Sequence, residues 1–535
     1  MRRSCVIDEQ HPPNDAEPQT AASEPGLDRS RAAGVSQPNR ADQISCDTGA
    51  AANMEGKATM DGQSPNKLRR DAVGVAHVVF FVVAAAAPLT AVVGVTPAAF
   101  AFGNGPGVPG TFLLVGVLYL LFSVGFTTMN RFVASAGGFY PYITAGLGRP
   151  LGVAGALIAL ATYNAIDIAV YGMFGFFSNA IVTSHGGPDI PWWVYAFGLG
   201  IAVYLCGKRH IAFSGKVLGF CMIAEIAILL LLGVAILVTG GGPEHISVAP
   251  FGPHAMFSSG FGVALVFVVS AFIGIEATVI FGEEARDPAR TIPTATYVSV
   301  LLIAVFYAFS TWAISVYYGP SNILAEATKN TATLYLNAVG RLLGPGTALV
   351  MNMLLLTSLF ACGLSFHSTI NRYFFAIGRE GLAWSGFART HRDHESPHVA
   401  GAVQTLIGMG ATAAFALTRQ DPYAVVFAWM GTFASLGILV IQIMVSIAII
   451  AFFNKNTQGI GLWHRLIAPV LSTVGLGTCL VLMAFNLSLV SGSDSRIVNA
   501  FPSLLALIGA IGFGFAIWVR SRRPEIYARL GRAFE

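Results

Sequence analysis

Charged residues are scarce in this sequence. Only 11% of its 535 residues are Asp, Glu, Lys or Arg, and 54% are hydrophobic. About a quarter of the residues are charged in an ordinary soluble domain, so this composition excludes that class and indicates an integral membrane protein. The net charge of +4 is small and follows from basic loops, as described below, so we expect no nucleic-acid partner.

Motifs for catalysis and metal binding are also missing. The six cysteines are scattered, and no pair has the spacing of a redox or metal motif, so we expect no metal site. No Gly-Lys-Thr or Gly-Lys-Ser phosphate-binding loop occurs, which argues against an ATP-driven pump. Because no His and Asp cluster and no nucleophile with a base is present, we expect neither an enzyme nor a cofactor.

The first 70 residues differ from the rest of the chain. They are rich in polar residues and proline and lack apolar periodicity, which predicts a disordered cytoplasmic tail, residues 1–70. No stretch in it resembles a cleavable signal. Met54 and Met60 leave open a translation start further downstream.

Long apolar segments fill the remainder. Such a segment crosses roughly 30 Å of hydrocarbon as a helix that rises about 1.5 Å per residue. The sequence predicts twelve of them, at residues 74–102, 108–130, 151–181, 191–206, 217–239, 259–282, 296–318, 345–377, 399–417, 424–453, 466–490 and 500–519. The expected fold class is therefore an all-α integral membrane protein with about 12 transmembrane helices.

The distribution of Lys and Arg predicts the orientation. With the N-terminus inside, the cytoplasmic loops and flanks hold 21 basic residues and the external loops hold four. Basic residues accumulate on the cytoplasmic side of membrane proteins. We therefore expect a multi-pass protein of the cytoplasmic (plasma) membrane with both termini in the cytoplasm.

Two of the predicted helices contain interruptions at mid-membrane. Pro88 in the first removes the hydrogen bond to the carbonyl of Ala84, and Gly274 stands next to Glu276 in the sixth. Irregular backbone in a bilayer is tolerated where it lines a cavity or is buried in protein. Each residue alone also suits an ordinary kink or close helix packing, but the pair favours a cavity.

The interruptions correspond if the first ten helices form a 5+5 inverted repeat. Broken helices 1 and 6 would then be equivalent members of two halves, a sign of a transporter's binding site. The domain plan is a permease domain, 71–523, with a first repeat at 71–240, a second at 258–453 and helices 11 and 12 at 465–519. A short cytoplasmic C-terminus, 524–535, follows.

Several stretches carry a resemblance to a known family. "AFIGIEA" followed by "GEEARDPARTIPTA" (271–295) looks like a broken sixth helix and the loop after it, and "ASAGGFYPYITAGLGRPLG" (134–152) like the loop after helix two. "NRYFFAIGREG" and "SPHVAG" (371–381, 396–401) resemble the end of helix eight and the loop into nine. With the twelve-helix plan, the chain after residue 70 resembles the amino acid-polyamine-organocation permeases, which share the leucine-transporter fold.

The chain departs from this family in two places. Many relatives have a glycine-rich turn in the first broken helix, whereas this sequence has "AAAAPLT", so proline has to open the backbone. Many also have an aromatic gate just before the equivalent of "FIG". Ser270 and Ala271 stand there instead, which makes Phe272 the nearest candidate.

The resemblance implies a substrate site at the breaks. Free N–H groups near Leu89 and Thr90 would hold a carboxylate, and carbonyls near Ala84–Ala86 and Phe272 would face an ammonium. The expected substrate-binding residues are Ala84, Ala85, Ala86, Ala87, Pro88, Leu89, Thr90, Phe272, Ile273, Gly274 and Glu276.

Three acids lie inside predicted membrane helices, where such residues are costly and often functional. Glu276 is expected to stabilise the unwound turn by accepting backbone or hydroxyl hydrogen bonds and to couple that turn to substrate or proton, or else to be a protonated, purely structural carboxyl group. Glu225 is a candidate proton carrier or sodium ligand, or a structural carboxyl. Asp167 shares a helix face with Asn164 and Tyr171, and suits a cationic substrate, proton transfer or a polar network with Tyr163 or Tyr171.

These expectations combine into one function. We expect a secondary active transporter that moves amino acids across the membrane by alternating access, as a symporter coupled to H+ or Na+. The alternatives are a polyamine or amine carrier, an amino acid exchanger and, less favoured, a transport-like membrane sensor. The expected partners are a small-molecule substrate and the lipid bilayer, with no obligate protein partner.

Overall fold

The computed structural model describes residues 74–133, 137–208, 212–280, 285, 287–391 and 396–531. Contacts divide the chain into Met1–Gly62 and Gln63–Glu535, and all the described residues lie in the second unit. The predicted disordered tail, residues 1–70, falls outside the described residues. Parts of two family-like stretches do so as well, at 134–136 and 281–284.

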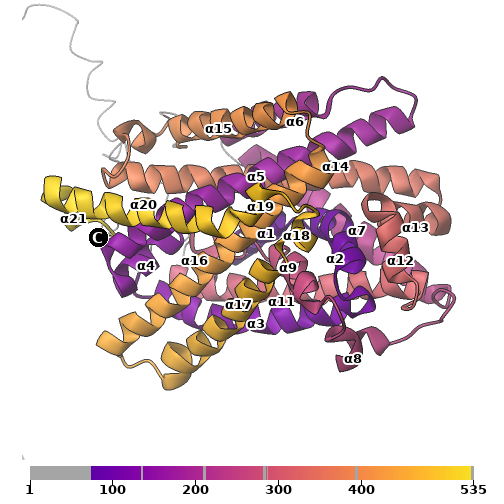
Figure 1. Ribbon diagram of the computed structural model, residues 1–535, viewed down its shortest axis with the longest axis horizontal. Helices are drawn as coiled ribbons and strands as arrows, with labels where there is room; N and C mark the ends of the chain where they lie inside the picture. The colour runs from indigo at the N-terminus through magenta and orange to yellow at the C-terminus, as the bar shows by residue number, and fades with distance from the viewer. Residues whose placement is uncertain are drawn as a thin grey trace, which may run out of the picture. The chain divides into compact units, whose positions relative to one another are not determined.

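The described residues form helices joined by turns and loops, without a strand (Figure 1). The long helices are α3 (Val108–Asn130), α5 (Arg149–Ser184), α6 (Trp192–Lys208), α7 (Ala212–Val238), α11 (Pro288–Tyr318), α14 (Pro345–Arg379), α15 (His398–Leu417), α16 (Ala428–Lys455), α17 (Ala468–Phe485) and α20 (Phe501–Arg522). The short helices are α1 (Val75–Ala86), α2 (Thr96–Phe102), α4 (Phe139–Leu147), α8 (Pro253–Met256), α9 (Phe261–Ser270), α10 (Ala277–Ile280), α12 (Ile323–Lys329), α13 (Leu334–Leu343), α18 (Leu487–Ser491), α19 (Arg496–Asn499) and α21 (Pro524–Arg529).

Ten stretches of the described residues are long and apolar enough to cross a membrane. They coincide with ten of the twelve predicted segments, which confirms an all-helical membrane protein. The other two segments fall on α6, which has 17 residues, and on α9, which has ten and is followed by a break. The count of twelve and the inverted repeat remain predictions.

Helix α5 is central to the packing. It contacts α14, α16, α20 and α6 (Figure 1). Small residues let these helices approach closely: a Cβ added at Gly437 of α16 would lie 2.0 Å from the Thr162 hydroxyl oxygen of α5. In lipid, such close packing is a main source of helix association, because burial of apolar surface contributes little there.

The predicted short C-terminus is docked on the helical unit as far as residue 531. Arg149, the first residue of α5, donates from Nη2 to the carbonyl of Ala528 at 3.0 Å. The backbone N–H of Gly531 donates to Oε1 of Glu380 at 2.9 Å. The last turn of the described chain therefore ties the end of α14 to the start of α5.

Candidate functional site

The first membrane span is interrupted at Ala87. Helix α1 ends at Ala86, and Ala87 has a φ of 44° before the helix resumes through a π-helical turn, Thr90–Val95, into α2. Pro88 explains the interruption, because its ring disfavours the helical conformation of the preceding residue and it has no N–H to donate to the turn before it. The break predicted from Pro88 is therefore present.

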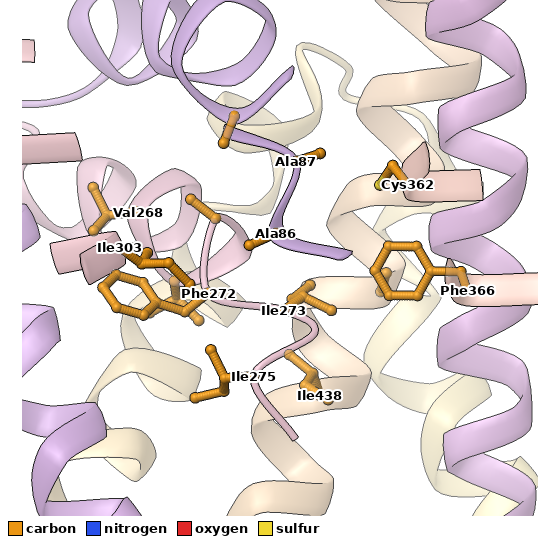
Figure 2. Close-up of a cluster of buried hydrophobic side chains, with 14 of the residues drawn as sticks. Ala86, Ala87, Val268, Phe272, Ile273, Ile275, Ile303, Cys362, Phe366 and Ile438 are labelled. Atoms are coloured by element: carbon orange, nitrogen blue, oxygen red, sulfur yellow. The ribbon is translucent and has the colours of Figure 1, made fainter. Parts of the chain in front are cut away.

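The sixth predicted segment is also interrupted. Helix α9 ends at Ser270, and residues 271–276 form turns before α10. Gly274 has a φ of 111°, and a Cβ there would lie 2.8 Å from the Cβ of Ala85. The two breaks are thus in contact. Figure 2 shows the two segments of backbone that carry Ala86 and Ile273 next to each other.

Glu276 holds the second break in shape. Its Oε1 accepts a hydrogen bond from the Tyr163 hydroxyl at 2.9 Å, and its Oε2 accepts one from the Gly274 N–H at 3.0 Å. The side chain is buried. These bonds are of the backbone and hydroxyl kinds expected from the sequence, whereas a role toward substrate or proton stays a prediction.

The carbonyls freed at the first break have side-chain donors. The Ala85 carbonyl accepts from Cys362 Sγ at 3.4 Å, and the Ala86 carbonyl accepts from the Tyr307 hydroxyl at 3.1 Å. Cys362 belongs to α14 and Tyr307 to α11. Buried backbone groups need such partners, so two neighbouring helices hold the break open.

The N–H groups after the break also have partners. The Thr90 N–H donates to the Ser358 hydroxyl oxygen at 3.4 Å. The carboxyl group of Glu225, on α7, faces the Leu89 N–H and the Ser358 hydroxyl, which both interact with it. The protein's own carboxyl group therefore occupies the end of the half-helix at which the resemblance implies a substrate carboxylate.

Asp167 takes part in a buried polar network. Its Oδ2 accepts from Gln404 Nε2 at 2.6 Å, and Oε1 of Gln404 pairs with Nδ1 of His367. The three residues come from α5, α15 and α14. This agrees with a polar network in kind, but the residue that donates to Asp167 is Gln404 instead of the expected Tyr163 or Tyr171, and Tyr163 donates to Glu276.

A cavity of about 430 Å³ lies beside the two breaks. Its lining comes from α1 and α2, α5, α9 and the turn after it, α14 and α16, and it extends to loop residues such as Thr331 and Gly492. Gly492 is exposed, so the cavity reaches the surface of the described unit. No Lys, Arg, His, Asp or Glu is among the described residues that line it.

The predicted substrate-binding residues divide into two groups. The members that line the cavity are Ala85, Ala86, Ala87, Thr90 and Ile273. The members that do not line it are Ala84, Pro88, Leu89, Phe272, Gly274 and Glu276, and the predicted coupling residues Glu225 and Asp167 do not line it either. Ala84, Pro88, Leu89, Phe272, Gly274 and Glu276 belong to the interrupted segments or to the residues beside them, Glu225 contacts the first break, and Asp167 bonds Gln404 instead.

Phe272 is not placed as a gate. Its ring stacks on Tyr119 of α3, with centroids 4.8 Å apart, and also contacts Phe112. The Phe272 and Ile273 side chains point to different sides of the turn (Figure 2), and Ile273 lines the cavity whereas Phe272 does not. The expected gating role is therefore corrected: the aromatic residue of this helix that lines the cavity is Phe267.

The sequence analysis missed most of the apolar lining. The missed residues include Met173 of α5, Phe366 of α14, and Tyr423 and Phe427 before α16. Apolar residues are abundant on every face of these helices, so no sequence signal separates cavity-lining members from lipid-facing or packed ones. On α5 the cavity face carries Met173, while the predicted face with Asp167 points to α15.

Comparison with known proteins finds one protein family that matches most of the chain. A family model described as "Amino acid permease" matches residues 77–527. The chain is 23% identical to the branched-chain amino acid permease BcaP of Bacillus subtilis (strain 168) over 387 residues, covering 66% of this chain and 75% of that protein.

Two other relatives have names that refer to different substrates. The low-affinity putrescine importer PlaP of Escherichia coli (strain K12) is 23% identical over 57% of this chain and 65% of its own length. The D-serine/D-alanine/glycine transporter of the same strain is 25% identical over 38% of this chain and 44% of its own length. In both cases the alignment spans less than two thirds of the relative.

Proposed function

Because the chain belongs to the amino acid permease family, we propose that it is a secondary active transporter that moves amino acids, or amines related to them, by alternating access. The cavity beside the two touching breaks is the observation that carries the proposal. Broken helices at the midplane expose backbone hydrogen-bonding groups to a small polar molecule, which a continuous helix cannot do.

The proposed direction of access follows from the basic residues. The cavity extends to Thr331 and Gly492, in loops that the distribution of Lys and Arg assigns to the external side. The proposed state is therefore outward-facing, in the cytoplasmic membrane, with both termini inside. Movement of the broken helices against α5, α14 and α16 would expose the same site to the cytoplasm.

We propose H+ or Na+ as the coupling ion, with Glu225 as the first candidate residue and Asp167 as the second. Glu225 supports this role because a buried carboxyl group that contacts the Leu89 N–H links its own charge to the geometry of the break. Asp167 is the second candidate because it is buried on α5 and accepts a hydrogen bond from the Gln404 side chain, not from a backbone group of the break.

Amine carriage and exchange form the second candidate function. One relative of the chain is named as a putrescine importer, which supports this candidate. The acids near the cavity and the absence of basic residues among its described lining residues favour a cationic substrate. In an exchanger the counter-substrate, rather than an ion gradient, would drive accumulation.

Uptake into proteoliposomes tests the proposal. The purified protein is offered radiolabelled neutral, acidic and basic amino acids and putrescine, under a proton gradient and a sodium gradient imposed separately. Concentrative uptake under one gradient is the expected result and identifies the ion. Counterflow with a preloaded substrate, without gradient-driven uptake, would assign exchange, and no flux of any compound would contradict the proposed function.

A further inference from the structure

Resting on the proposed function, we propose that the cavity selects an organic amine that lacks a carboxylate. Amino acids and amines share the ammonium group and differ in whether a carboxylate accompanies it. The question is therefore which of these two charges the cavity can hold.

The donors that would bind a carboxylate are already engaged. At the start of the half-helix that runs to Phe102, Pro88 has no N–H, the Leu89 N–H faces Glu225 and the Thr90 N–H donates to Ser358. Two of these three positions thus serve the protein's own side chains. A substrate carboxylate placed there would lie beside the Glu225 carboxyl group and compete for the same N–H groups.

Acceptors that would bind an ammonium are free. The hydroxyl oxygen of Thr90 is buried, lines the cavity and has no hydrogen-bond partner among the described residues. The carbonyls of Ala271 and Ile273, in the turn that interrupts the sixth span, accept no hydrogen bond from the described residues and also belong to lining residues. An ammonium group has three N–H donors and no acceptor, so acceptors without a partner are the groups that it can use.

Three buried acids lie near the cavity. Cys362 lines the cavity and lies close to both Glu225 and Asp167, while Glu276 holds the turn next to Ile273. No basic residue is among the described lining residues to offset these acids. In a low-dielectric interior an ionised acid attracts cations and repels anions, and a bound cation in turn stabilises the ionised form.

The remaining walls suit an apolar body. Val170 and Met173 of α5, Phe267 of α9 and Phe366 of α14 face the space next to the acceptors. An alkyl or aryl group fits walls of this kind, and aromatic rings also attract a nearby ammonium. The structure thus assigns the carboxylate position to Glu225 and leaves the ammonium position to the substrate.

Matched pairs of compounds test this inference. Each amine is compared with the amino acid from which it differs by one carboxylate: isoamylamine with leucine, phenethylamine with phenylalanine, and putrescine with ornithine. Binding to the purified full-length protein is measured by thermal stabilisation, and transport by counterflow in proteoliposomes. At least one amine should bind about tenfold or more tightly than its amino acid, since an unpaired buried carboxylate is strongly disfavoured.

Two variants connect the selectivity to its cause. Glu225→Gln keeps the size of the side chain and removes the group that can ionise beside a bound ammonium, so amine affinity should fall by about tenfold and the preference over the matched amino acid should shrink. Glu525→Gln removes an exposed carboxyl group on α21 and should leave both affinities unchanged. If Glu225→Gln does not fold, the comparison of each amine with its matched amino acid in the wild-type protein still tests the proposed preference for amines.

The contrary outcomes are distinct. Tighter binding of the amino acid in every pair would overturn the inference and leave the transporter function intact. An unchanged preference in folded Glu225→Gln would overturn the assignment of the carboxylate position to Glu225. Absence of binding and transport for all six compounds would overturn this inference, and absence of flux for the wider panel of amino acids as well would contradict the proposed function itself.

Discussion

Gly274 has a backbone conformation, with a φ of 111°, that residues with side chains seldom adopt. The space around it is as restrictive as the conformation, because a Cβ would lie 2.8 Å from that of Ala85. The same residue also donates its N–H to Glu276 at 3.0 Å. A single glycine therefore fixes both the shape of the sixth-span break and its contact with the first.

Gly274→Ala should damage this site. Strain at a special backbone conformation is on the order of 1–3 kcal/mol, and the clash with Ala85 adds to it, so we expect a lower unfolding temperature and reduced uptake. Gly346→Ala is the matched control, because no atom lies within 4 Å of a Cβ placed there and its φ is not positive. Equal uptake and stability in both variants would show that the turn does not need glycine.

At the scale of elements, the first membrane span consists of two half-helices. Helix α1 and the segment from Thr90 to Phe102 are offset at Ala87, and Pro88 begins the second half. Side chains from α7, α11 and α14 then satisfy the backbone groups that the offset releases. The break thus depends on one local residue and on three distant helices.

Pro88→Ala should close the break. Alanine supplies the missing N–H to the Ala84 carbonyl and permits a helical conformation at residue 87, so the variant should be at least as stable as the wild type and transport more slowly. Pro345→Ala, at the exposed first position of α14, should change neither property, because proline is well tolerated there. Unchanged uptake in Pro88→Ala would mean that the distant helices alone maintain the break.

At the scale of the whole molecule, the cavity is open toward one end of the helical unit. It extends from the breaks to Thr331 and Gly492, whereas the opposite end carries the contact of Gly531 with Glu380. The distribution of Lys and Arg predicts that the first end faces the outside and the second the cytoplasm. The proposed alternating-access transport would require such a polarity in its resting state.

Labelling of Cys362 in cells tests this polarity. Cys362 lines the cavity, and the other described cysteines, Cys206, Cys221 and Cys479, do not. A cationic membrane-impermeant thiol reagent added outside should label Cys362, and a transported amine should slow the reaction. A Cys362→Ser variant should lose the signal, and labelling confined to inside-out vesicles would contradict the predicted orientation.

The fold class and the positions of the two helix breaks could be predicted from the sequence. Scarce charge and long apolar segments identify a helical membrane protein, and Pro88 identifies the first break because its effect on the backbone is local. Gly274 and Glu276 likewise mark the second break. Phe272 could not be placed in the same way, since the direction of its ring follows from the turn at Gly274 and from the stack with Tyr119.

The sequence by itself determined the membrane class, the positions of the breaks and the residues of the family-like stretches, because each follows from composition or from the covalent geometry of neighbouring residues. Only the tertiary structure decided that Ala85 meets Gly274, that Glu225 reaches Leu89 and that Asp167 bonds Gln404 instead of lining the cavity. These pairs lie far apart in the chain, and helix packing alone brings them together.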